Sequence, residues 1–114
     1  MSNQIDTLLK ELVHDLKAIF DDSLYSIILF GSYARGDFDI DSDVDIMVIV
    51  DIPANEISHY RDDVNKIASR LSLKSDNCTT ICILIQDLTT FIRFRDYHVF
   101  LNNIATEGVT LYAS

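Results

Sequence analysis

Apolar residues near the start of the chain recur at the spacing of an amphipathic helix. The pattern comprises eight positions: Ile5, Leu8, Leu9, Leu12, Val13, Leu16, Ile19 and Phe20. Polar residues fill the gaps between them, so the spacing predicts a helix with one buried face. The polar triplet Asp21–Ser23 predicts the end of this helix.

Three short apolar runs have the length and the isoleucine and valine content of buried strands. These runs are Leu24–Phe30, Val44–Val50 and residues 78–85. Short apolar runs rich in β-branched residues are typical of strands in the core of a sheet. The Gly31-Ser32 pair breaks the first run, and Pro53 stops the second.

The rest of the chain predicts further helices and one last strand. Apolar residues keep helical spacing over residues 57–71, and residues 88–104 contain enough of it for one or two helices, with Asp87 or Thr89 as the candidate N-cap. Residues 109–112 predict a short strand. Strands alternating with helices in this order predict an α+β fold (α/β two-layer), in which a small mixed β-sheet packs against helices.

Composition limits the functions that the chain can perform. At 114 residues it can bury a core without disulfides or a structural metal, and we expect a single domain over residues 1–114. A formal net charge of −9 argues against binding to a nucleic-acid backbone, which requires a basic surface. The same charge suits a cation site or a basic protein partner, although solubility alone also accounts for it.

Signals for secretion or membrane insertion are not evident. The N-terminus has acidic residues early and lacks the basic lead and apolar block of a signal peptide, and the longest apolar run is too short to span a bilayer. Cys78 and Cys82 lie four residues apart on one predicted strand, too far to bond to each other, so we expect buried thiols. These features predict a cytoplasmic protein without membrane association.

Aspartates occupy every second position ahead of the second predicted strand. They are Asp37, Asp39, Asp41, Asp43 and Asp45. Strand alternation puts the carboxylates of Asp43 and Asp45 on one face, about 6–7 Å apart, where they repel each other unless a cation lies between them. Mg²⁺ prefers oxygen ligands and takes one or two protein carboxylates plus substrate phosphates. The pair therefore indicates a Mg²⁺–nucleotide site, and a solvated acidic turn is the alternative.

The Gly31-Ser32 pair favours the first of these interpretations. Glycine lets the backbone approach a ligand closely, and the Ser32 hydroxyl with neighbouring amides can hold phosphate oxygens. Ten residues separate Ser32 from Asp43. If the first two strands are neighbours, the phosphate-binding turn and the carboxylates meet at one end of the sheet, as phosphoryl or nucleotidyl transfer requires.

The stretch from Phe30 to Asp45 resembles the signature of a known enzyme family. The pattern is a hydrophobic residue followed by Phe-Gly-Ser, ten residues, and Asp-x-Asp, with Tyr-Ala-Arg-Gly inside it. It is similar to the minimal nucleotidyltransferases of the DNA polymerase beta-like nucleotidyltransferase superfamily. The resemblance is strongest over residues 24–50 and extends more weakly to the C-terminal TEGVTLY.

The resemblance implies a mixed sheet on helices, Mg²⁺ as cofactor and a nucleoside triphosphate, commonly ATP, as substrate. In that picture Gly31 and Ser32 bind the triphosphate, and Asp43 and Asp45 are the catalytic metal ligands. Arg35 either contacts phosphate as part of the nucleotide site or steadies its loop by pairing with a nearby acid. An acceptor hydroxyl would attack the α-phosphorus and release pyrophosphate.

The resemblance also implies a protein partner. Free-standing members are often paired with a small helical HEPN toxin, and the nucleotidyltransferase acts as the antitoxin, in some systems by adenylylating a tyrosine of the toxin. The last helical region carries a charged, aromatic segment that contains Arg93, Arg95, Asp96, Tyr97 and His98. We interpret this segment as helix surface, and partner contact is the alternative.

One element of the family pattern is missing. The superfamily normally adds a third carboxylate on a later strand, but the run at residues 78–85 contains no acid, and Thr80 and Cys82 occupy the expected face. Asp76 precedes that run and Asp87 follows it. The alternative function is therefore an antitoxin with weak or no catalysis that neutralises its partner by binding. Asp37, Asp39 and Asp41 have no role in the pattern, and we expect them in a solvated loop.

Overall fold

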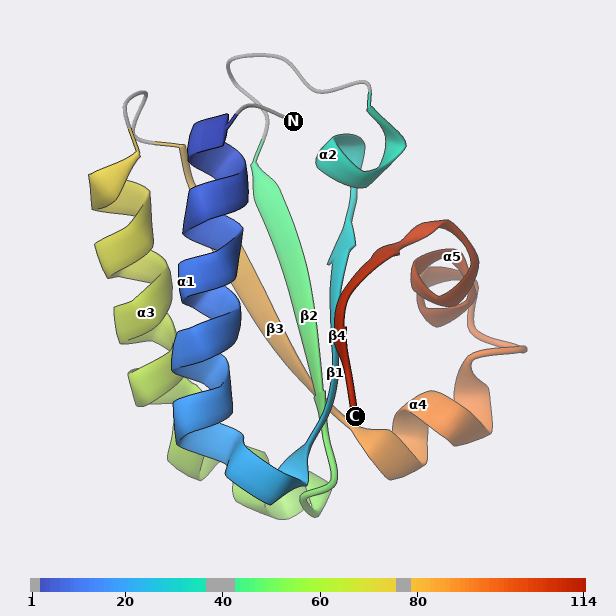
Figure 1. Cartoon of the computed structure of the whole chain (residues 1–114). Helices are drawn as coiled ribbons and strands as arrows, with labels where there is room; N and C mark the ends of the chain where they lie inside the picture. The colour runs from blue at the N-terminus through green and yellow to red at the C-terminus, as the bar shows by residue number, and fades with distance from the viewer. Residues whose placement is uncertain (1–2, 37–42, 76–78) are drawn as a thin grey trace.

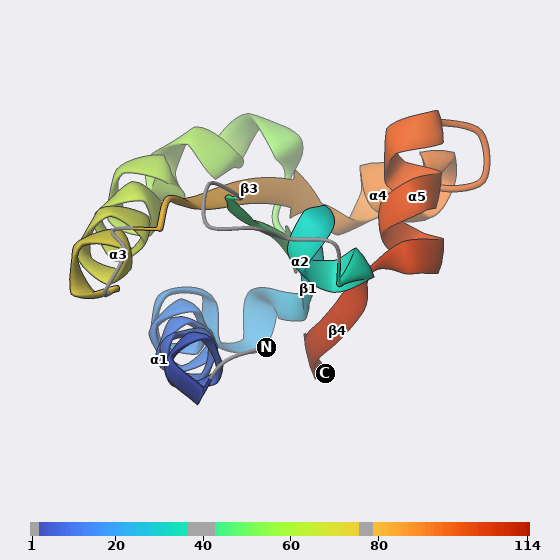
Figure 2. The same ribbon diagram turned by 90° about the horizontal axis from the view of Figure 1, so that it is seen from above.

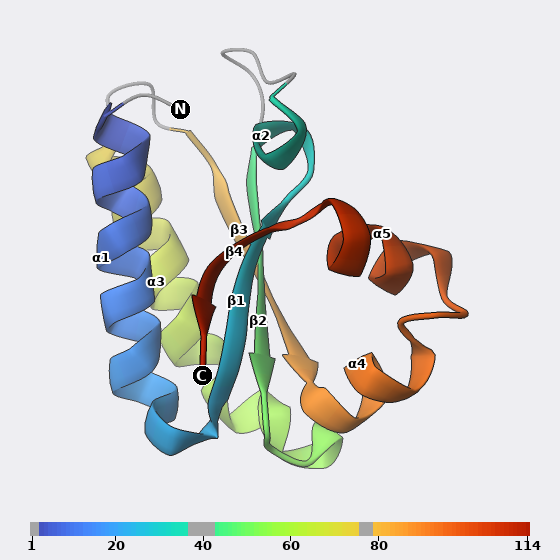
Figure 3. The same ribbon diagram turned by 45° about the vertical axis from the view of Figure 1, so that its right-hand side comes forward.

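The computed structural model describes residues 3–36, 43–75 and 79–114, and four strands form its single sheet. The strands are β1 (Leu24–Phe30), β2 (Val44–Val50), β3 (Ile81–Asp87) and β4 (Val109–Ala113). Their order across the sheet is β3-β2-β1-β4, and Figure 3 shows β4 beside β1. The β1–β2 and β1–β4 pairs are antiparallel and the β2–β3 pair is parallel, so the predicted mixed sheet is confirmed.

Helices lie against both faces of this sheet. The helical segments are α1 (Asn3–Phe20), η1 (Asp21–Ser23), α2 (Ser32–Arg35), η2 (Ala54–Tyr60), α3 (Arg61–Lys74), α4 (Leu88–Phe94) and α5 (Val99–Glu107). Helices α1 and α3 cover one face, while α4 and α5 lie on the other (Figures 1 and 2). The predicted α+β class is confirmed, and the structure adds a second, smaller helical layer to the two that the sequence indicated.

Strand alternation divides the core between the two faces. Val44, Ile46 and Val48 of β2 pack into the large core under α1 and α3. Met47 and Ile49, at the intervening positions, pack into a smaller core with residues of α4 and α5. Because side chains on a strand alternate, the odd-numbered acids at the start of β2 share the α4/α5 face.

The third strand begins and ends later than the sequence indicates. Residues 78–85 were the predicted run, but β3 spans Ile81–Asp87, and Thr80 lies just before it. Pairing with β2 sets this boundary, because Val44 pairs with Ile81 and Val50 with Asp87. The Val44 N–H still bonds to the Thr80 carbonyl at 2.9 Å, so the chain reaches the sheet edge before regular pairing begins.

The chain after β3 follows the prediction closely. The region predicted as helical, residues 88–104, forms two helices, α4 and α5, of which α5 continues to Glu107, and the Asp87 carboxylate caps the first by accepting from the Thr90 N–H at 2.9 Å. Cys82 is a free thiol, and Cys78 lies outside the described residues. Among the helices of the described ranges, none is long and apolar enough to cross a membrane.

Candidate functional site

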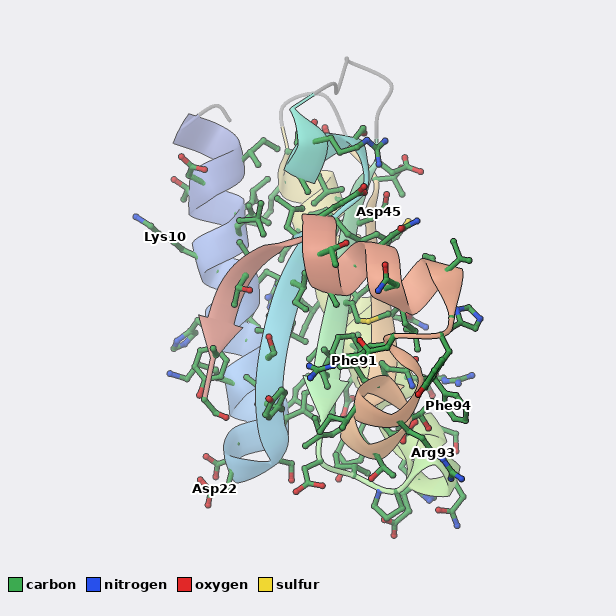
Figure 4. The ribbon with its side chains drawn as sticks, turned by 90° about the vertical axis from the view of Figure 1, so that its right-hand side faces the viewer. Lys10, Asp22, Asp45, Phe91, Arg93 and Phe94 are labelled. Carbon is green, nitrogen blue, oxygen red and sulfur yellow. The ribbon has the colours of Figure 1, made fainter. Side chains whose placement is uncertain are left out.

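The two site aspartates lie where β2 begins, at the end of the sheet that carries α2. Asp43 is exposed and directly precedes the strand, while Asp45 is half-buried within it. On the sheet, Asp45 pairs with Phe30 of β1 on one side and with Cys82 of β3 on the other. Figure 4 shows Asp45 toward the α2 end of the sheet, far from Arg93 and Phe94 on α4. The predicted placement of both acids at the start of this strand is therefore confirmed.

Gly31 brings the turn after β1 against the Asp45 carboxylate. Its backbone has φ +78° and ψ −157°, a conformation that side-chain-bearing residues rarely adopt. A Cβ at this position would lie 2.5 Å from Asp45 Oδ2, so any side chain would collide with the carboxylate. The predicted convergence of the glycine turn with the aspartate pair is thus a direct contact.

A short helix, which the sequence did not indicate, follows this glycine. In α2 the Gly31 carbonyl accepts hydrogen bonds from the Ala34 and Arg35 N–H groups at 3.1 and 3.2 Å, and Gly36 ends the helix with φ +81°. The N–H groups at the start of a helix point outward along its axis, where they can face an anion. Ser32 is the first residue of α2, which places its hydroxyl beside these groups.

Burial and like charge both act on Asp45. Burial raises the pKa of the Asp45 carboxyl above its ordinary value of 3.8, and the nearby Asp43 charge raises it further. A carboxylate whose ionisation is penalised by a neighbouring negative charge favours a cation between the two groups. Their oxygen atoms are the ligand type that Mg²⁺ prefers, and one or two carboxylates suffice when substrate phosphates complete the shell. Asp43 and Asp45 therefore fit the Mg²⁺ that the family pattern implies.

Arg35 contributes the opposing charge at this site. Its guanidinium partly offsets the two effects above and lowers the pKa of Asp45. The side chain is exposed and lies on α2, one turn after Gly31. A cation in this position can act on the aspartate pair and on an incoming phosphate. The alternative pairing with Asp37, Asp39 or Asp41 involves acids outside the described residues.

Cys82 occupies the position beside Asp45 where a third carboxylate was expected. Burial raises the pKa of the Cys82 thiol, and the charges of Asp43 and Asp45 raise it further. The thiol thus faces the acid pair as a neutral group. Within the described residues, no group of three or more histidine, cysteine or acidic side chains could hold a metal ion.

The one replacement acid that the structure describes lies away from this site. Asp87 is buried at the far end of β3, level with Val50, where it caps α4. Asp76 lies outside the described residues. Thr80, predicted to share the site face, is exposed and precedes β3. The described part of the site therefore contains two carboxylates and a thiol.

A pocket of about 250 Å³ adjoins Gly31. Its lining residues are Phe30, Gly31, Ala34, Arg35, Phe100, Asn103, Ile104 and Glu107. The last four come from α5, some 70 positions along the chain from Gly31. They were missed at the sequence level, although their i, i+3, i+4, i+7 spacing places them on one helix face.

Comparison with known proteins finds a matching family and several relatives. Residues 8–103 match the model of the family described as nucleotidyltransferase domain. "Putative protein adenylyltransferase MJ0141" of Methanocaldococcus jannaschii is 45% identical over 74 residues, which cover 64% of this chain and 72% of the relative. "Putative protein adenylyltransferase MJ0604" of the same organism is 33% identical over 104 residues, covering 91% and 94%.

A solved structure supports the fold independently. It is described as a toxin–antitoxin with AMP-PNP, and the matching chain is 21% identical, with a TM-score of 0.57. The match covers 99% of the present chain and 75% of the solved one. At this identity the likeness establishes the fold.

Proposed function

We propose that this chain, a nucleotidyltransferase that belongs to the nucleotidyltransferase domain family, transfers AMP from ATP to a hydroxyl group of a partner protein. One observation carries the proposal above the others. The Gly31 turn lies so close to the Asp45 carboxylate that no side chain fits between them. A phosphate bound by the turn would therefore lie next to the aspartate pair.

Different residues of the site bind the triphosphate and the metal ion. Gly31 and Ser32 hold the triphosphate through backbone amides and the hydroxyl, and Arg35 adds a positive charge. Asp43 and Asp45 would hold Mg²⁺ at the start of β2. The bound metal would supply charge neutralisation at the reacting phosphate. Because β1–β2 pairing fixes Asp45 relative to the turn, the phosphate is oriented before the acceptor arrives.

The proposed reaction forms one bond and breaks one. The acceptor oxygen attacks the α-phosphorus of ATP, and a new phosphodiester bond forms between the acceptor and AMP. The bond from the α-phosphorus to the bridging oxygen of the β-phosphate breaks, and pyrophosphate leaves with that electron pair. The hydroxyl proton passes to solvent, because the Cys82 thiol beside the acid pair stays protonated.

We propose a tyrosine of a helical HEPN-type toxin as the acceptor, which makes this chain the antitoxin of the pair. The relatives named as protein adenylyltransferases and the toxin–antitoxin structure support a protein acceptor. An exposed apolar surface around α4 and α5 also supports it: Ile92, Phe94, Tyr97, Val99 and Phe100. Large patches of exposed apolar side chains often mark protein interaction sites.

Labelled nucleotide tests the chemistry directly. The purified chain is incubated with ATP labelled at the α-phosphate, Mg²⁺ and the protein encoded beside it. We expect label on a tyrosine of that protein, and no label with Asp43→Asn/Asp45→Asn or when EDTA replaces Mg²⁺. Label at the γ-phosphate must not transfer. Failure to label any acceptor, under conditions where the two proteins form a complex, would refute the proposal.

A second candidate function is neutralisation by binding alone. The neutral Cys82 thiol in place of a third carboxylate favours it, because a weaker metal site slows catalysis. The two functions separate in cells that express the partner toxin. If Asp43→Asn/Asp45→Asn still protects those cells fully, contact suffices. If protection disappears while the complex persists, transfer is required.

A further inference from the structure

Helix α5 turns one face toward the Gly31 turn, and the transfer reaction described above makes no use of it. Phe100, Asn103, Ile104 and Glu107 lie on this face and line one wall of the 250 Å³ pocket. Phe30, Gly31, Ala34 and Arg35 form the opposite wall. The volume is below the roughly 300–1,000 Å³ of sites for whole drug-sized ligands. A pocket of this size can hold one ring system of a ligand whose remaining groups bind outside the pocket.

Aromatic and aliphatic side chains form part of the pocket lining. The Phe30 and Phe100 rings meet edge to face, with centroids 5.7 Å apart and an interplanar angle of 86°. Phe100 remains 43% exposed, so part of its ring is open to a ligand, and Ile104 beneath it is buried. Flat apolar surfaces of this kind accept the face of a nucleobase, and stacking on an aromatic side chain stabilises it.

Two polar side chains lie at successive turns of the same helix face. Asn103 offers both a donor and an acceptor, and an ionised Glu107 only accepts. Asparagine pairs with adenine by accepting from its exocyclic amino group and donating to a ring nitrogen. Glu107 accepts a hydrogen from the same kind of amino group. Guanine and hypoxanthine carry a carbonyl oxygen at that ring position, which a carboxylate repels.

The pocket is continuous with the phosphate-binding turn. Gly31 and Arg35 belong both to its wall and to the site described above. A nucleotide with its phosphates at Gly31 therefore has its base within reach of α5. We propose that this pocket holds the adenine base of ATP, and that Asn103 and Glu107 select it by its 6-amino group. The inference rests on the proposed adenylyl transfer and assigns its base specificity.

Binding measurements test the assignment without turnover. Titration calorimetry in Mg²⁺ compares ATP, ITP, GTP and inorganic tripolyphosphate against the full chain. We expect ATP to bind about tenfold or more tightly than ITP or GTP, in line with a two-point base contact. Asn103→Ala and Glu107→Gln should each reduce that ratio several-fold through weaker ATP binding. Neither change should alter affinity for tripolyphosphate, which has no base.

Asn102→Ala is the matched control. Asn102 precedes Asn103 on α5 and does not line the pocket, so its substitution should leave all four affinities unchanged. Equal affinities of the unmodified chain for ATP and ITP would overturn the assignment. So would equal losses of ATP and tripolyphosphate affinity in the Asn103 and Glu107 variants. If the Asn103 and Glu107 variants kept their ATP affinity but showed a raised KM for the acceptor, the pocket would bind the acceptor, and the adenine assignment would be wrong.

The labelling experiment separates this inference from the function on which it rests. If α-labelled ATP modifies the partner but base selectivity is absent, the base assignment alone fails. If neither label transfer nor nucleotide binding is seen, the adenylyl-transfer proposal fails and the pocket assignment fails with it. Label transfer together with selectivity that depends on Asn103 and Glu107 supports both.

Discussion

The two faces of the sheet differ in how completely they are covered. On the α1/α3 face, even-numbered residues of β2 are sealed in the large core, and Val44, Ile46 and Val48 are fully buried. On the α4/α5 face, the core is smaller and fewer side chains are fully buried. There Asp45 is half-buried and Leu84 of β3 is 46% exposed. The α1/α3 face, which we call the closed face, holds the fold together. The α4/α5 face, which we call the open face, leaves room for ligands.

A single strand serves both purposes because its side chains alternate. Asp45 and Ile46 are adjacent in sequence, yet they face opposite layers. Each face can therefore be altered separately. Substitutions on the closed face should act on stability, and those on the open face should act on chemistry with little effect on folding.

Paired substitutions at Asp45 and Ile46 should show the largest contrast. Asp45→Asn should lower AMP transfer by about 10³-fold, the upper range for losing one preorganised stabilising group. Its stability should stay equal or rise slightly, because burial and the Asp43 charge penalise ionised Asp45. Ile46→Ala should cost about 2–5 kcal/mol of unfolding free energy. Urea unfolding and label transfer measure both quantities.

The opposite pattern would contradict this division of labour. If Asp45→Asn unfolded at much lower urea than the unmodified chain, the open face would also be essential to the fold. If folded Ile46→Ala protein transferred AMP about 10³-fold more slowly, measured well below its unfolding midpoint, the closed face would take part in the chemistry.

Gly31→Ala should lower both stability and AMP transfer, because Gly31 belongs to the turn and touches Asp45. Positive φ at a residue with a side chain costs about 1–3 kcal/mol, and the new Cβ would meet Asp45 Oδ2 at 2.5 Å unless the carboxylate moves. We expect that loss of stability and about a 10²-fold slower transfer, the cost typical of a 1 Å misplacement. Gly36→Ala is the control, because it shares the positive φ but has open space around it.

Cys82→Asp should increase AMP transfer, because it supplies the third carboxylate that the family pattern includes. The new acid would pair with Asp45 across β2 and β3. We expect transfer to rise about tenfold, less than the roughly 10²–10⁴-fold of an established general base. Without Mg²⁺ the variant should be less stable than the unmodified chain, because three carboxylates then repel one another. Cys82→Ser, which adds no charge, should change neither property, and an equal gain with serine would refute the electrostatic explanation.

The sequence predicted the closed face better than the open one. Strands β1 and β2 match their predicted bounds, because long apolar runs directly report burial. The convergence of Gly31 with Asp43 and Asp45 was also predictable, since neighbouring strands bring a turn and a strand start together. The start of β3 was not, because pairing of Ile81 with Val44 sets it and the residues before it have similar strand propensity.

The pocket on α5 lay beyond sequence reasoning for a different reason. Asn103 and Glu107 resemble ordinary polar positions of a helix surface, and nothing local distinguishes them. They become part of a site only because α5 packs across the sheet near Gly31, a tertiary contact between distant segments. Helix α2 was missed as well, because four residues are too few to carry a periodic signal.

The smallest expected effect concerns the charge of Arg35. Arg35 lowers the pKa of Asp45, so Arg35→Gln should raise that pKa further in the metal-free protein. A raised carboxyl pKa means that the folded state binds the proton more tightly than the unfolded one. Between the ordinary value of 3.8 and the raised pKa, Asp45 therefore makes stability fall as pH rises. Arg35→Gln should extend this window upward, because the folded chain holds the proton to higher pH.

Carboxyl-carbon NMR titration of Asp45 measures the shift, and Arg93→Gln, on α4 at the far end of the open face, is the control. A titration of Asp45 that is the same in the Arg35 variant and the unmodified chain would show that Arg35 acts away from the acid pair.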